Sequence, residues 1–587
     1  MSRSLHALAL ALATGLLALV GCNSPGIDAA SARADGVTAS VPVEEARDGT
    51  QKHVVLTSEV DGVDISFELF EPDRLEPGQS YPLVLHGHGY GGSRITERSG
   101  FVARLTAAGY YVISIDQRGF GESGGTVRVL SPDFEGQDLV QILDWAEDLP
   151  GLARRDGNML IGAYGGSYGG GYQLTLLGAD PENRLDALVP DITWHDLRYS
   201  LAPNGIIKSG WILALVAAGE QGSNLGQDNF IRETLVLGTL DNNFPESAAN
   251  LFAYHSPIYH CDRLTPQPQE FLIATPDPGN VASRRLPGVD VMLTQGMRDT
   301  LFNFNEAVDN FQCLRALGGD VRLLTHESGH ILPVALPEEV KDSLDPLFAL
   351  VNVPEFQDGG GPRDCGNVSL TDAQFAWFEE KLRGQSGAVD AALESRRDVC
   401  ISLGDGDAVA LDNVPHGGTE FTLDVSTPQL NSVLGIVGSL LGNGVRELVL
   451  ADIPLMTVPE GGAVVAGVPT MQLEVSGLSG LEFEQCPLPL LETGCDPLYF
   501  LGLSVRKAGQ TRFELIDDQL TPIRGFGTFG SADAPMEMSG IAERLEAGDT
   551  LALQIYAFHV QYPITWSRDL IVPAATFAGS VQVPFLD

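Results

Sequence analysis

The chain has 587 residues, of which 44% are hydrophobic and 19% are charged. At about 100–200 residues per domain, this length predicts two or three folded units with enough apolar residues to bury a core. Thirty-five Lys and Arg against 77 Asp and Glu give a formal net charge of -42, which would repel phosphate backbones and excludes nucleic acid as a partner.

The N-terminal segment has the pattern of an export signal. Arg3 precedes an apolar stretch over residues 5–20, which is shorter than the ~20 residues that a membrane-spanning helix needs. The stretch ends in Leu-Val-Gly-Cys22, which resembles the lipobox of bacterial lipoproteins, in which the peptide before the Cys is removed and the Cys thiol is acylated. We therefore expect a signal peptide over 1–21 and a lipid on Cys22.

The residues after Cys22 predict the cellular location of the protein and a flexible spacer. Asn23, rather than Asp, follows the Cys, and the lipoprotein resemblance then implies the outer membrane of a bacterial cell envelope, on either face. Residues 22–50 are rich in Ala, Ser, Gly, Asp and Pro without apolar periodicity, so they are expected to form a flexible tether. The lipid is the one membrane contact that we expect.

Residues 51–385 alternate between short apolar runs and helix-length segments, which predicts a mostly parallel sheet covered by helices on both faces, an α/β fold. Residues 194–285 break this rhythm with helix-like segments and are expected to be an inserted helical cap. Strands are expected at 54–70, 83–86, 110–116, 159–163, 185–189, 289–295 and 321–325, and helices at 98–108, 134–147, 206–218, 230–237, 305–317 and 370–382.

A candidate nucleophile lies between the expected strand 159–163 and a helix-like segment. Gly165-Gly-Ser167-Tyr-Gly169 has the G-x-S-x-G pattern of a nucleophile elbow, in which glycines allow a tight strand-to-helix turn that exposes the Ser hydroxyl. The pattern alone is weak in a Gly-rich chain, but the strand before it and the helix after it make it specific. We therefore predict that Ser167 is a catalytic nucleophile.

A Ser nucleophile needs a base and a carboxylate that orients the base, and in this fold they follow the Ser in the order acid, then His. Asp299 follows the expected strand 289–295, and His330 follows the expected strand 321–325. Two alternatives remain open: Asp309 as the acid, although it falls in the expected helix 305–317, and His326 as the base, although it belongs to the strand.

The tetrahedral intermediate also needs hydrogen-bond donors for its oxyanion. The backbone N–H of Tyr168, directly after the nucleophile, is one candidate. The loop His86-Gly-His88-Gly-Tyr90-Gly-Gly92 ends a strand and contains the glycines that let backbone amides point inward. The second donor is therefore predicted to be the N–H of His88 or the hydroxyl of Tyr90, and for Tyr90 a role in contacting the substrate at the rim of the site is an equal alternative.

After residue 396 the pattern changes to short apolar or alternating runs separated by Gly, Pro, Asp and Asn, so 396–587 is expected to be an all-β sandwich of the jelly-roll type. Apart from Cys22, the chain has an even number of cysteines, and in an exported protein these favour disulfides. The expected pairs are Cys486 with Cys495, Cys365 with Cys400, and by remainder Cys261 with Cys313. No C-x-x-C spacing occurs, so no metal site is expected.

Several stretches resemble the X-prolyl dipeptidyl aminopeptidase and cocaine esterase family of serine hydrolases. They are Asp116-Gln-Arg-Gly-Phe-Gly-Glu-Ser-Gly-Gly, residues 138–145, Gly165-Gly-Ser-Tyr-Gly-Gly, residues 296–302 around Asp299, Gly329-His330 and Leu545-Glu-Ala-Gly-Asp-Thr-Leu-Ala-Leu.

This resemblance implies an α/β-hydrolase core, a helical cap and a jelly roll, with Ser167, Asp299 and His330 as a triad and Arg118 in a buried ion pair. Where many members place a Pro-Tyr segment that completes the oxyanion hole, this chain has His-Gly-His-Gly-Tyr-Gly-Gly.

The resulting hypothesis is an exported, lipid-anchored serine hydrolase that cleaves carboxylic esters through an acyl-enzyme and needs no cofactor. An amide hydrolase of the X-prolyl dipeptidyl peptidase type is the first alternative, for which Asp191, Asp196, Glu220 or Glu233 could hold a substrate ammonium. The substrate of the hydrolase would be a small ester or peptide, or a polymer. A non-catalytic surface lipoprotein that binds glycans is the alternative from another class.

Overall fold

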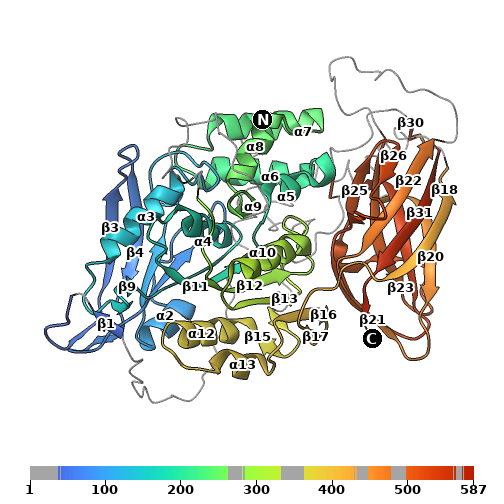
Figure 1. Ribbon diagram of the computed structural model, residues 1–587. Coiled ribbons are helices and arrows are strands. Elements are labelled where there is room, and N and C mark those ends of the chain that lie inside the picture. The colour runs from blue at the N-terminus through green and yellow to red at the C-terminus, as the bar shows by residue number, and fades with distance from the viewer. Residues whose placement is uncertain are drawn as a thin grey trace, which may run out of the picture.

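The structure is a computed structural model that describes residues 37–39, 41–261, 281, 284–331, 363–428, 430–431, 447–477, 497–559, 561–562, 571–572 and 574–586. A sheet flanked by helices fills one side of the molecule, and antiparallel sheets fill the other (Figure 1). The fold is an α/β hydrolase followed by an antiparallel β domain, which confirms the predicted fold class.

In the described part of the chain, ten strands form the central sheet. They are β3 (Gln51–Thr57), β4 (Asp64–Phe70), β6 (Leu83–Gly87), β7 (Tyr111–Ile115), β10 (Ile161–Gly166), β11 (Leu185–Asp191), β12 (Asp290–Gly296), β13 (Val321–His326), β16 (Val399–Gly404) and β17 (Asp407–Leu411). Their order is β17-β16-β13-β12-β11-β10-β6-β7-β4-β3. The strands from β16 to β7 run parallel, whereas β3, β4 and β17 are antiparallel to their neighbours.

One expected strand is in fact a hairpin. The alternating pattern at 54–70 predicts a single strand, but β3 and β4 pair along their whole length across a turn. The backbone N–H of Gly62 donates to the carbonyl of Ser58 at 2.9 Å in this turn, and Gly62 has a φ of 79°, which glycine adopts at little cost. Period-2 alternation continues through the tight turn, so it does not reveal the break.

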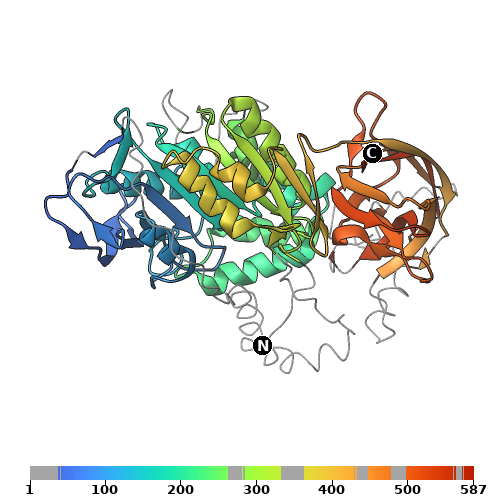
Figure 2. The ribbon, with the colours of Figure 1, turned by 90° about the horizontal axis from the view of Figure 1, so that it is seen from below.

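Helices cover both faces of the central sheet (Figure 2). On one face Leu139, Leu174 and Phe311 belong to one buried apolar cluster with the strands, and on the other face Leu105 and Trp377 belong to a second cluster. The first face carries α3 (Glu135–Ala146), α4 (Tyr168–Ala179) and α10 (Phe304–Leu317), and the second carries α2 (Gly100–Ala107), α12 (Leu370–Lys381) and α13 (Ala388–Leu393).

A helical cap is inserted between β11 and β12, as predicted. Its elements are α5 (Leu197–Leu201), η1 (Pro203–Gly205), α6 (Ser209–Gly222), α7 (Asn229–Asp241), α8 (Glu246–Tyr254) and α9 (Pro257–His260). In Figure 1, α5, α6, α7 and α8 lie together above the carboxyl ends of the sheet strands. The cap therefore stands over the edge of the sheet at which ligands of open α/β folds bind.

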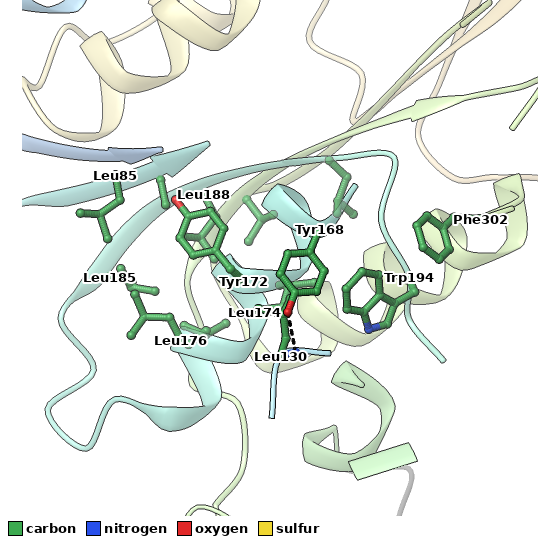
Figure 3. Packing of buried hydrophobic residues seen from close by; sticks show 14 of the residues in the cluster. Leu85, Leu130, Tyr168, Tyr172, Leu174, Leu176, Leu185, Leu188, Trp194 and Phe302 are labelled. Carbon is green, nitrogen blue, oxygen red and sulfur yellow. Dashed lines mark hydrogen bonds between the residues drawn. The ribbon is translucent and has the colours of Figure 1, made fainter. Parts of the chain in front are cut away.

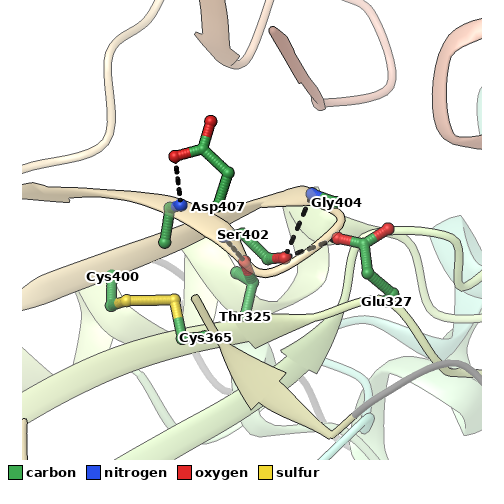
Figure 4. The surroundings of a disulfide bond; sticks show 8 residues. Thr325, Glu327, Cys365, Cys400, Ser402, Gly404 and Asp407 are labelled. Carbon is green, nitrogen blue, oxygen red and sulfur yellow. Dashed lines mark hydrogen bonds between the residues drawn. A yellow bond between two sulfur atoms is a disulfide. The ribbon is translucent and has the colours of Figure 1, made fainter. Parts of the chain in front are cut away.

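The boundary expected at residue 396 is wrong, because β16 and β17 belong to the central sheet. Strand β16 pairs in parallel with β13, and the N–H of Ser402 donates to the hydroxyl of Thr325 at 2.7 Å (Figure 4). The disulfide between Cys365 and Cys400 fastens the same strand. Strands β16 and β17 are short and are flanked by polar residues, as are the strands that follow them. Composition therefore does not distinguish them from the strands of the β domain.

The β domain, as the term is used below, begins at β18 (Thr419–Ser426). One sheet contains β18, β22 (Thr470–Gly477), β26 (Gly527–Phe529), β27 (Met536–Glu537) and β31 (Ala575–Val583), and the other contains β20 (Glu447–Thr457), β23 (Leu498–Arg506), β24 (Glu514–Leu515), β25 (Thr521–Arg524) and β29 (Thr550–His559). Smaller sheets join β21 (Ala463–Gly467), β28 (Ile541–Leu545) and β32 (Phe585–Leu586), and β19 (Leu430–Asn431) with β30 (Ile571–Val572). Leu473 and Phe577 from the first sheet and Leu553 from the second share one buried core.

The predicted flexible tether over 22–50 is also corrected in its described part. Strand β1 (Val37–Ala39) pairs with β8 (Ala153–Arg155), which continues to β9 (Asn158–Met159), and β2 (Arg47–Asp48) pairs with β5 (Arg74–Leu75). The guanidinium of Arg47 donates to the buried carboxylate of Glu71 at 2.5 and 2.7 Å. These contacts attach the segment to the hydrolase domain although its composition resembles that of a linker.

Two disulfides are present in the described residues, Cys261–Cys313 and Cys365–Cys400. Both are pairings that the sequence analysis expects. Strands β14 (Asp364–Cys365) and β15 (Val368–Ser369) lead from the second disulfide into α12. Cys22, Cys486 and Cys495 lie outside the described residues. None of the helices within the described ranges is both long and apolar enough to cross a membrane.

Candidate active site

Ser167 occupies a sharp turn between β10 and α4. Its φ of 60° and ψ of -120° are outside the regions that a non-glycine residue normally adopts. The turn depends on close backbone approach, because a Cβ added to Gly165 would lie 2.4 Å from the carbonyl oxygen of Gly87, and one added to Gly169 would lie 2.1 Å from the same atom. Both flanking glycines are therefore required, as the G-x-S-x-G pattern predicts.

Aromatic packing fixes the start of α4 beneath this turn. The ring of Tyr168 is 2% exposed and contacts Trp194, which in turn packs against Phe302 (Figure 3). The hydroxyl of Tyr168 accepts a hydrogen bond of 3.1 Å from the backbone N–H of Leu130. With its side chain held in the core, Tyr168 presents only its backbone at the turn.

Ser167, His330 and Asp299 form one line of hydrogen bonds. The Oγ of Ser167 lies 2.9 Å from Nε2 of His330, and Nδ1 of His330 lies 2.6 Å from Oδ2 of Asp299. Asp299 is fully buried, whereas the side chain of His330 is 18% exposed. The arrangement has the geometry by which a His can take the proton of a Ser hydroxyl while a carboxylate holds the imidazole.

Asp299 is held by the loop that carries it, residues 297–303 between β12 and α10, called the acid loop below. Its Oδ1 accepts hydrogen bonds from the backbone N–H groups of Leu301 and Phe302 at 2.9 and 2.7 Å. Its Oδ2 also accepts from the backbone N–H of His330 at 3.0 Å. A Cβ added to Gly329 would lie 2.8 Å from the Cβ of Asp299, so glycine lets the two loops touch.

The two alternative residues lie elsewhere. His326 ends β13 and is fully buried; its Nε2 is 3.1 Å from Oδ1 of Asp191, and its Nδ1 accepts from the hydroxyl of Ser328. Burial lowers the pKa of His326 to about 4, so this ring is neutral at neutral pH. Asp309 lies inside α10 and is partly exposed. Both are thus separate from the line of hydrogen bonds at Ser167.

The loop over residues 86–92 lies against the first turn of α4, next to Ser167. The ring of His88 is buried and fixes this loop, because Nδ1 donates to the carbonyl of Gly89 at 2.8 Å and Nε2 accepts from the backbone N–H of Gln117 at 3.0 Å. The side chain of His88 is therefore structural. The backbone N–H of Tyr168 is at the N-terminus of α4, where helical amides have no intrahelical acceptor.

The hydroxyl of Tyr90 accepts a hydrogen bond of 2.5 Å from the side-chain amide of Gln227 in the cap. Its ring packs edge-on against Tyr168 and Phe120. This phenol consequently links the loop to the cap.

Helix α6 of the cap covers the site from His330 to the loop at Gly91. The indole of Trp211 packs edge-on against the ring of His330 at 5.8 Å between centroids and donates to the hydroxyl of Thr300 at 3.0 Å. At the other end of the helix, a Cβ added to Gly222 would lie 2.6 Å from the Cα of Gly91. Sequence reasoning missed Trp211, since a Trp in an apolar helix carries no catalytic signal.

Lys208 is a buried cation at the start of the same helix. Its Nζ donates to the carbonyl of Leu301 in the acid loop at 2.8 Å. Burial lowers the pKa of Lys208 to about 8, against the opposing effect of the nearby Asp299 carboxylate. The sequence gives no sign of this contact, because Lys208 and Leu301 come from separate elements.

The predicted buried ion pair of Arg118 is confirmed. Its guanidinium donates to the carboxylate of Asp138 on α3 at 2.7 and 2.8 Å and to Asp61 at 2.7 Å. Asp116, two residues earlier, is paired with Arg94. The Arg118 pairs join the segment after β7 to α3 and to the turn between β3 and β4, so they are structural. Within the described ranges, no three His, Cys, Asp or Glu side chains are grouped so that they could hold a metal ion.

Comparisons with known proteins bear on both parts of the chain. Residues 61–332 match the model of the family described as X-Pro dipeptidyl-peptidase (S15 family). The uncharacterized 31.7 kDa protein in the traX-finO intergenic region of Escherichia coli is 29% identical over 159 residues, which are 27% of this chain and 54% of that protein. The chain thus spans about half the length of this curated relative.

Two solved structures share the whole architecture. The CocE/NonD family hydrolase SACOL2612 from Staphylococcus aureus has a TM-score of 0.56 and 12% identity, covering 98% of this chain and 100% of that one. An aminopeptidase from the marine sediment archaeon Thaumarchaeota archaeon has a TM-score of 0.50 and 13% identity, covering 92% and 97%. At these identities the likeness establishes the fold.

Proposed function

This chain belongs to the X-Pro dipeptidyl-peptidase (S15) family of serine hydrolases through its residues 61–332, and we propose that it hydrolyses carboxylic esters with Ser167, His330 and Asp299 as its catalytic triad. The observation that carries this proposal is the line of hydrogen bonds from Ser167 Oγ to His330 Nε2 at 2.9 Å and from His330 Nδ1 to Asp299 Oδ2 at 2.6 Å.

In the proposed reaction, Oγ of Ser167 attacks the ester carbonyl while Nε2 of His330 takes the hydroxyl proton. His330 returns this proton to the departing alkoxide, which leaves an acyl group on Ser167. A water molecule then attacks the acyl carbonyl, with His330 again as the base, and releases the carboxylic acid and free Ser167. The buried carboxylate of Asp299 stabilises the imidazolium in both steps.

The oxyanion of each tetrahedral intermediate is proposed to bind two backbone N–H groups. The position of Tyr168 at the N-terminus of α4 supports its N–H as the first donor. The closeness of Gly87 to Gly169 supports the N–H of His88 as the second. Tyr90 is proposed to act by holding the cap, because its hydroxyl is already bonded to Gln227.

Esters are favoured over peptides with a free N-terminus by the state of the carboxylates that could bind an ammonium. Asp191 is ion-paired with Arg363 and hydrogen-bonded to the neutral ring of His326, and Asp196 is paired with Arg198. Glu233 is exposed on α7, and the side chain of Glu220 lies outside the described residues. The described candidates are thus either neutralised by a cation or directed to solvent, which weakens the case for dipeptide recognition.

Export to the cell envelope and a lipid anchor on Cys22 are part of the proposal. The disulfides Cys261–Cys313 and Cys365–Cys400 support an oxidising compartment. Replacing Cys22 with Ser should move the protein from the membrane fraction to the soluble fraction. Unchanged retention of the variant in the membrane fraction would remove the anchor from the proposal.

The central test uses a fluorophosphonate probe together with two chromogenic substrates. Wild type should be labelled and Ser167→Ala should not, and a short-acyl p-nitrophenyl ester should be turned over faster than an Xaa-Pro anilide. Turnover of the anilide alone would replace the esterase by the peptidase alternative. An unlabelled wild type that turns over neither substrate would favour the non-catalytic, glycan-binding alternative.

A further inference from the structure

The β domain contacts the acid loop through one buried amide side chain. Gln519 is 4% exposed, and its Nε2 donates to the carbonyl of Met297 at 2.9 Å and to the carbonyl of Asp299 at 3.0 Å. Both N–H groups of the carboxamide are therefore used on the loop that carries the proposed catalytic acid. Gln519 is separated from Asp299 by 220 residues.

A strained turn presents Gln519 to this loop. The preceding residues Asp517 and Asp518, in η3 (Ile516–Asp518), have φ values of 54° and 56°, which cost about 1–3 kcal/mol each for non-glycine residues. The turn is held by the N–H of Ala542, which donates to Asp517 at 2.7 Å, and by Arg298, which pairs with Asp518 at 2.6 Å. Strain of this kind persists at functional sites, where the surroundings hold it in place.

The far end of the acid loop is also attached to the β domain. The amide of Asn303 donates to the hydroxyl of Ser539 at 3.3 Å. At the start of α10, Asn305 donates to the carbonyl of Met538 at 3.0 Å and accepts from the N–H of Gly540 at 2.7 Å. The loop is thus fixed by the β domain on both sides of Asp299.

We propose that Gln519 is a positioning residue for Asp299, so that the β domain completes the catalytic site of the hydrolase domain. The catalytic part of this inference rests on the proposed function. Without the carboxamide, two buried carbonyls of the acid loop lose their donor and the loop relaxes. Displacement of a catalytic group by about 1 Å can lower a rate by about 10²-fold.

The variant for the test is Gln519→Met, which keeps the length of the side chain and removes both donors. The control is Gln554→Met, because Gln554 is also buried in the β domain but donates to Asp452 within it. Hydrogen exchange should become faster in peptides that cover the acid loop for Gln519→Met and not for Gln554→Met. The kcat for the short-acyl ester should fall roughly 10–100-fold for Gln519→Met, with KM within about twofold.

A double-mutant cycle separates positioning from a general loss of structure. If Gln519 acts through Asp299, adding Gln519→Met to Asp299→Asn should change kcat less than about twofold further. An equal loss in both backgrounds would overturn the inference, and so would unchanged exchange together with unchanged kcat in the single variant. A wild type that neither turns over the ester nor reacts with the fluorophosphonate would refute the ester hydrolase proposal, while the exchange comparison would still decide whether Gln519 holds the loop.

Discussion

The carboxyl group of Glu306, on α10, accepts a hydrogen bond of 2.8 Å from the backbone N–H of Asp196 at the base of the cap. The same oxygen accepts from the N–H of His195, and the second oxygen is bonded to the hydroxyl of Ser200. Glu306 is 1% exposed. A single buried carboxyl group therefore joins the cap to the helix that follows the acid loop.

This contact predicts a pH-dependent stability. Burial raises the pKa of Glu306 from 4.5 to about 8, despite the hydrogen bonds that it accepts. The folded protein then keeps a proton that the unfolded chain has released, so the contribution of Glu306 is complete below about pH 4.5 and is lost as the pH rises through 8. Relative to Glu306→Gln, the free energy of unfolding of wild type should fall by on the order of a few kcal/mol between pH 5 and pH 9.

Urea unfolding at a series of pH values measures this difference. The amide of Gln can donate to Ser200 and accept from the two backbone N–H groups, so the variant should fold. The control is Glu233→Gln on the exposed surface of α7. The difference in free energy of unfolding between this variant and wild type should not change with pH. A flat difference for Glu306→Gln as well would mean that Glu306 is ionised in the folded protein at neutral pH.

The choice of the catalytic acid gives a second prediction. Asp299→Asn should lower kcat by about 10³–10⁴-fold, because Asn cannot stabilise the imidazolium and favours the wrong tautomer of His330. Asp309→Asn, on α10, should leave kcat within about twofold of wild type. The measurement is ester turnover by both variants after circular dichroism has shown that they are folded. Equal losses in the two variants would contradict the assignment of Asp299.

The positions of Ser167, Asp299 and His330 just after parallel strands explain why the candidate triad could be predicted. The G-x-S-x-G pattern is local, and the carboxyl ends of parallel strands meet at one edge of the sheet, so an Asp and a His just after later strands become candidates without knowledge of their contacts. The confirmed fold class follows in the same way from the alternation of period 2 and period 3.6. In each case the signal lies within about 20 residues of sequence.

Contacts between distant segments carried no such signal. Gln519 is one of many polar residues in a β-rich region, and only the folded chain brings it to Asp299. Trp211 and Lys208 reach the acid loop from an insertion whose place above the sheet is a tertiary property. The misplaced boundary at 396 has the same origin, since pairing of β16 with β13 cannot be read from the composition of either strand.

The glycines around Ser167 give a third prediction, in which a steric clash makes a Gly→Ala substitution in a helix destabilising. Gly→Ala inside a helix usually stabilises by about 0.5–1 kcal/mol. At Gly169, however, the new Cβ would lie 2.1 Å from the carbonyl oxygen of Gly87. Gly169→Ala should therefore lower the free energy of unfolding by about 1–3 kcal/mol. It should also lower kcat, because the loop over 86–92 must move away from α4.

Gly178 in the same helix is the matched control. A Cβ added there would meet its nearest atom, Cδ2 of His260, at 3.5 Å, which is an ordinary contact. Gly178→Ala should leave kcat unchanged and should keep or slightly raise the stability. Denaturant unfolding and ester kinetics on the two variants test the pair, and a Gly169→Ala enzyme with wild-type stability and kcat would contradict the close contact between the loop and α4.

The disulfide between Cys365 and Cys400 gives the last prediction. It closes a loop with a sequence separation of 35 residues and attaches β16 to the segment before α12. By its effect on the entropy of the unfolded chain, a disulfide that closes a loop of this length stabilises the folded state by about 4 kcal/mol. Strain in the folded protein and residual structure in the unfolded chain reduce this value. Replacing both cysteines by Ala should thus lower the free energy of unfolding by about 2–4 kcal/mol. The kcat of the folded variant should stay near that of wild type, because the hydrogen bonds that join Ser167, His330 and Asp299 do not involve this disulfide. A large loss of kcat at full folding would show that the end of the central sheet at β16 also positions His330, through its pairing with β13.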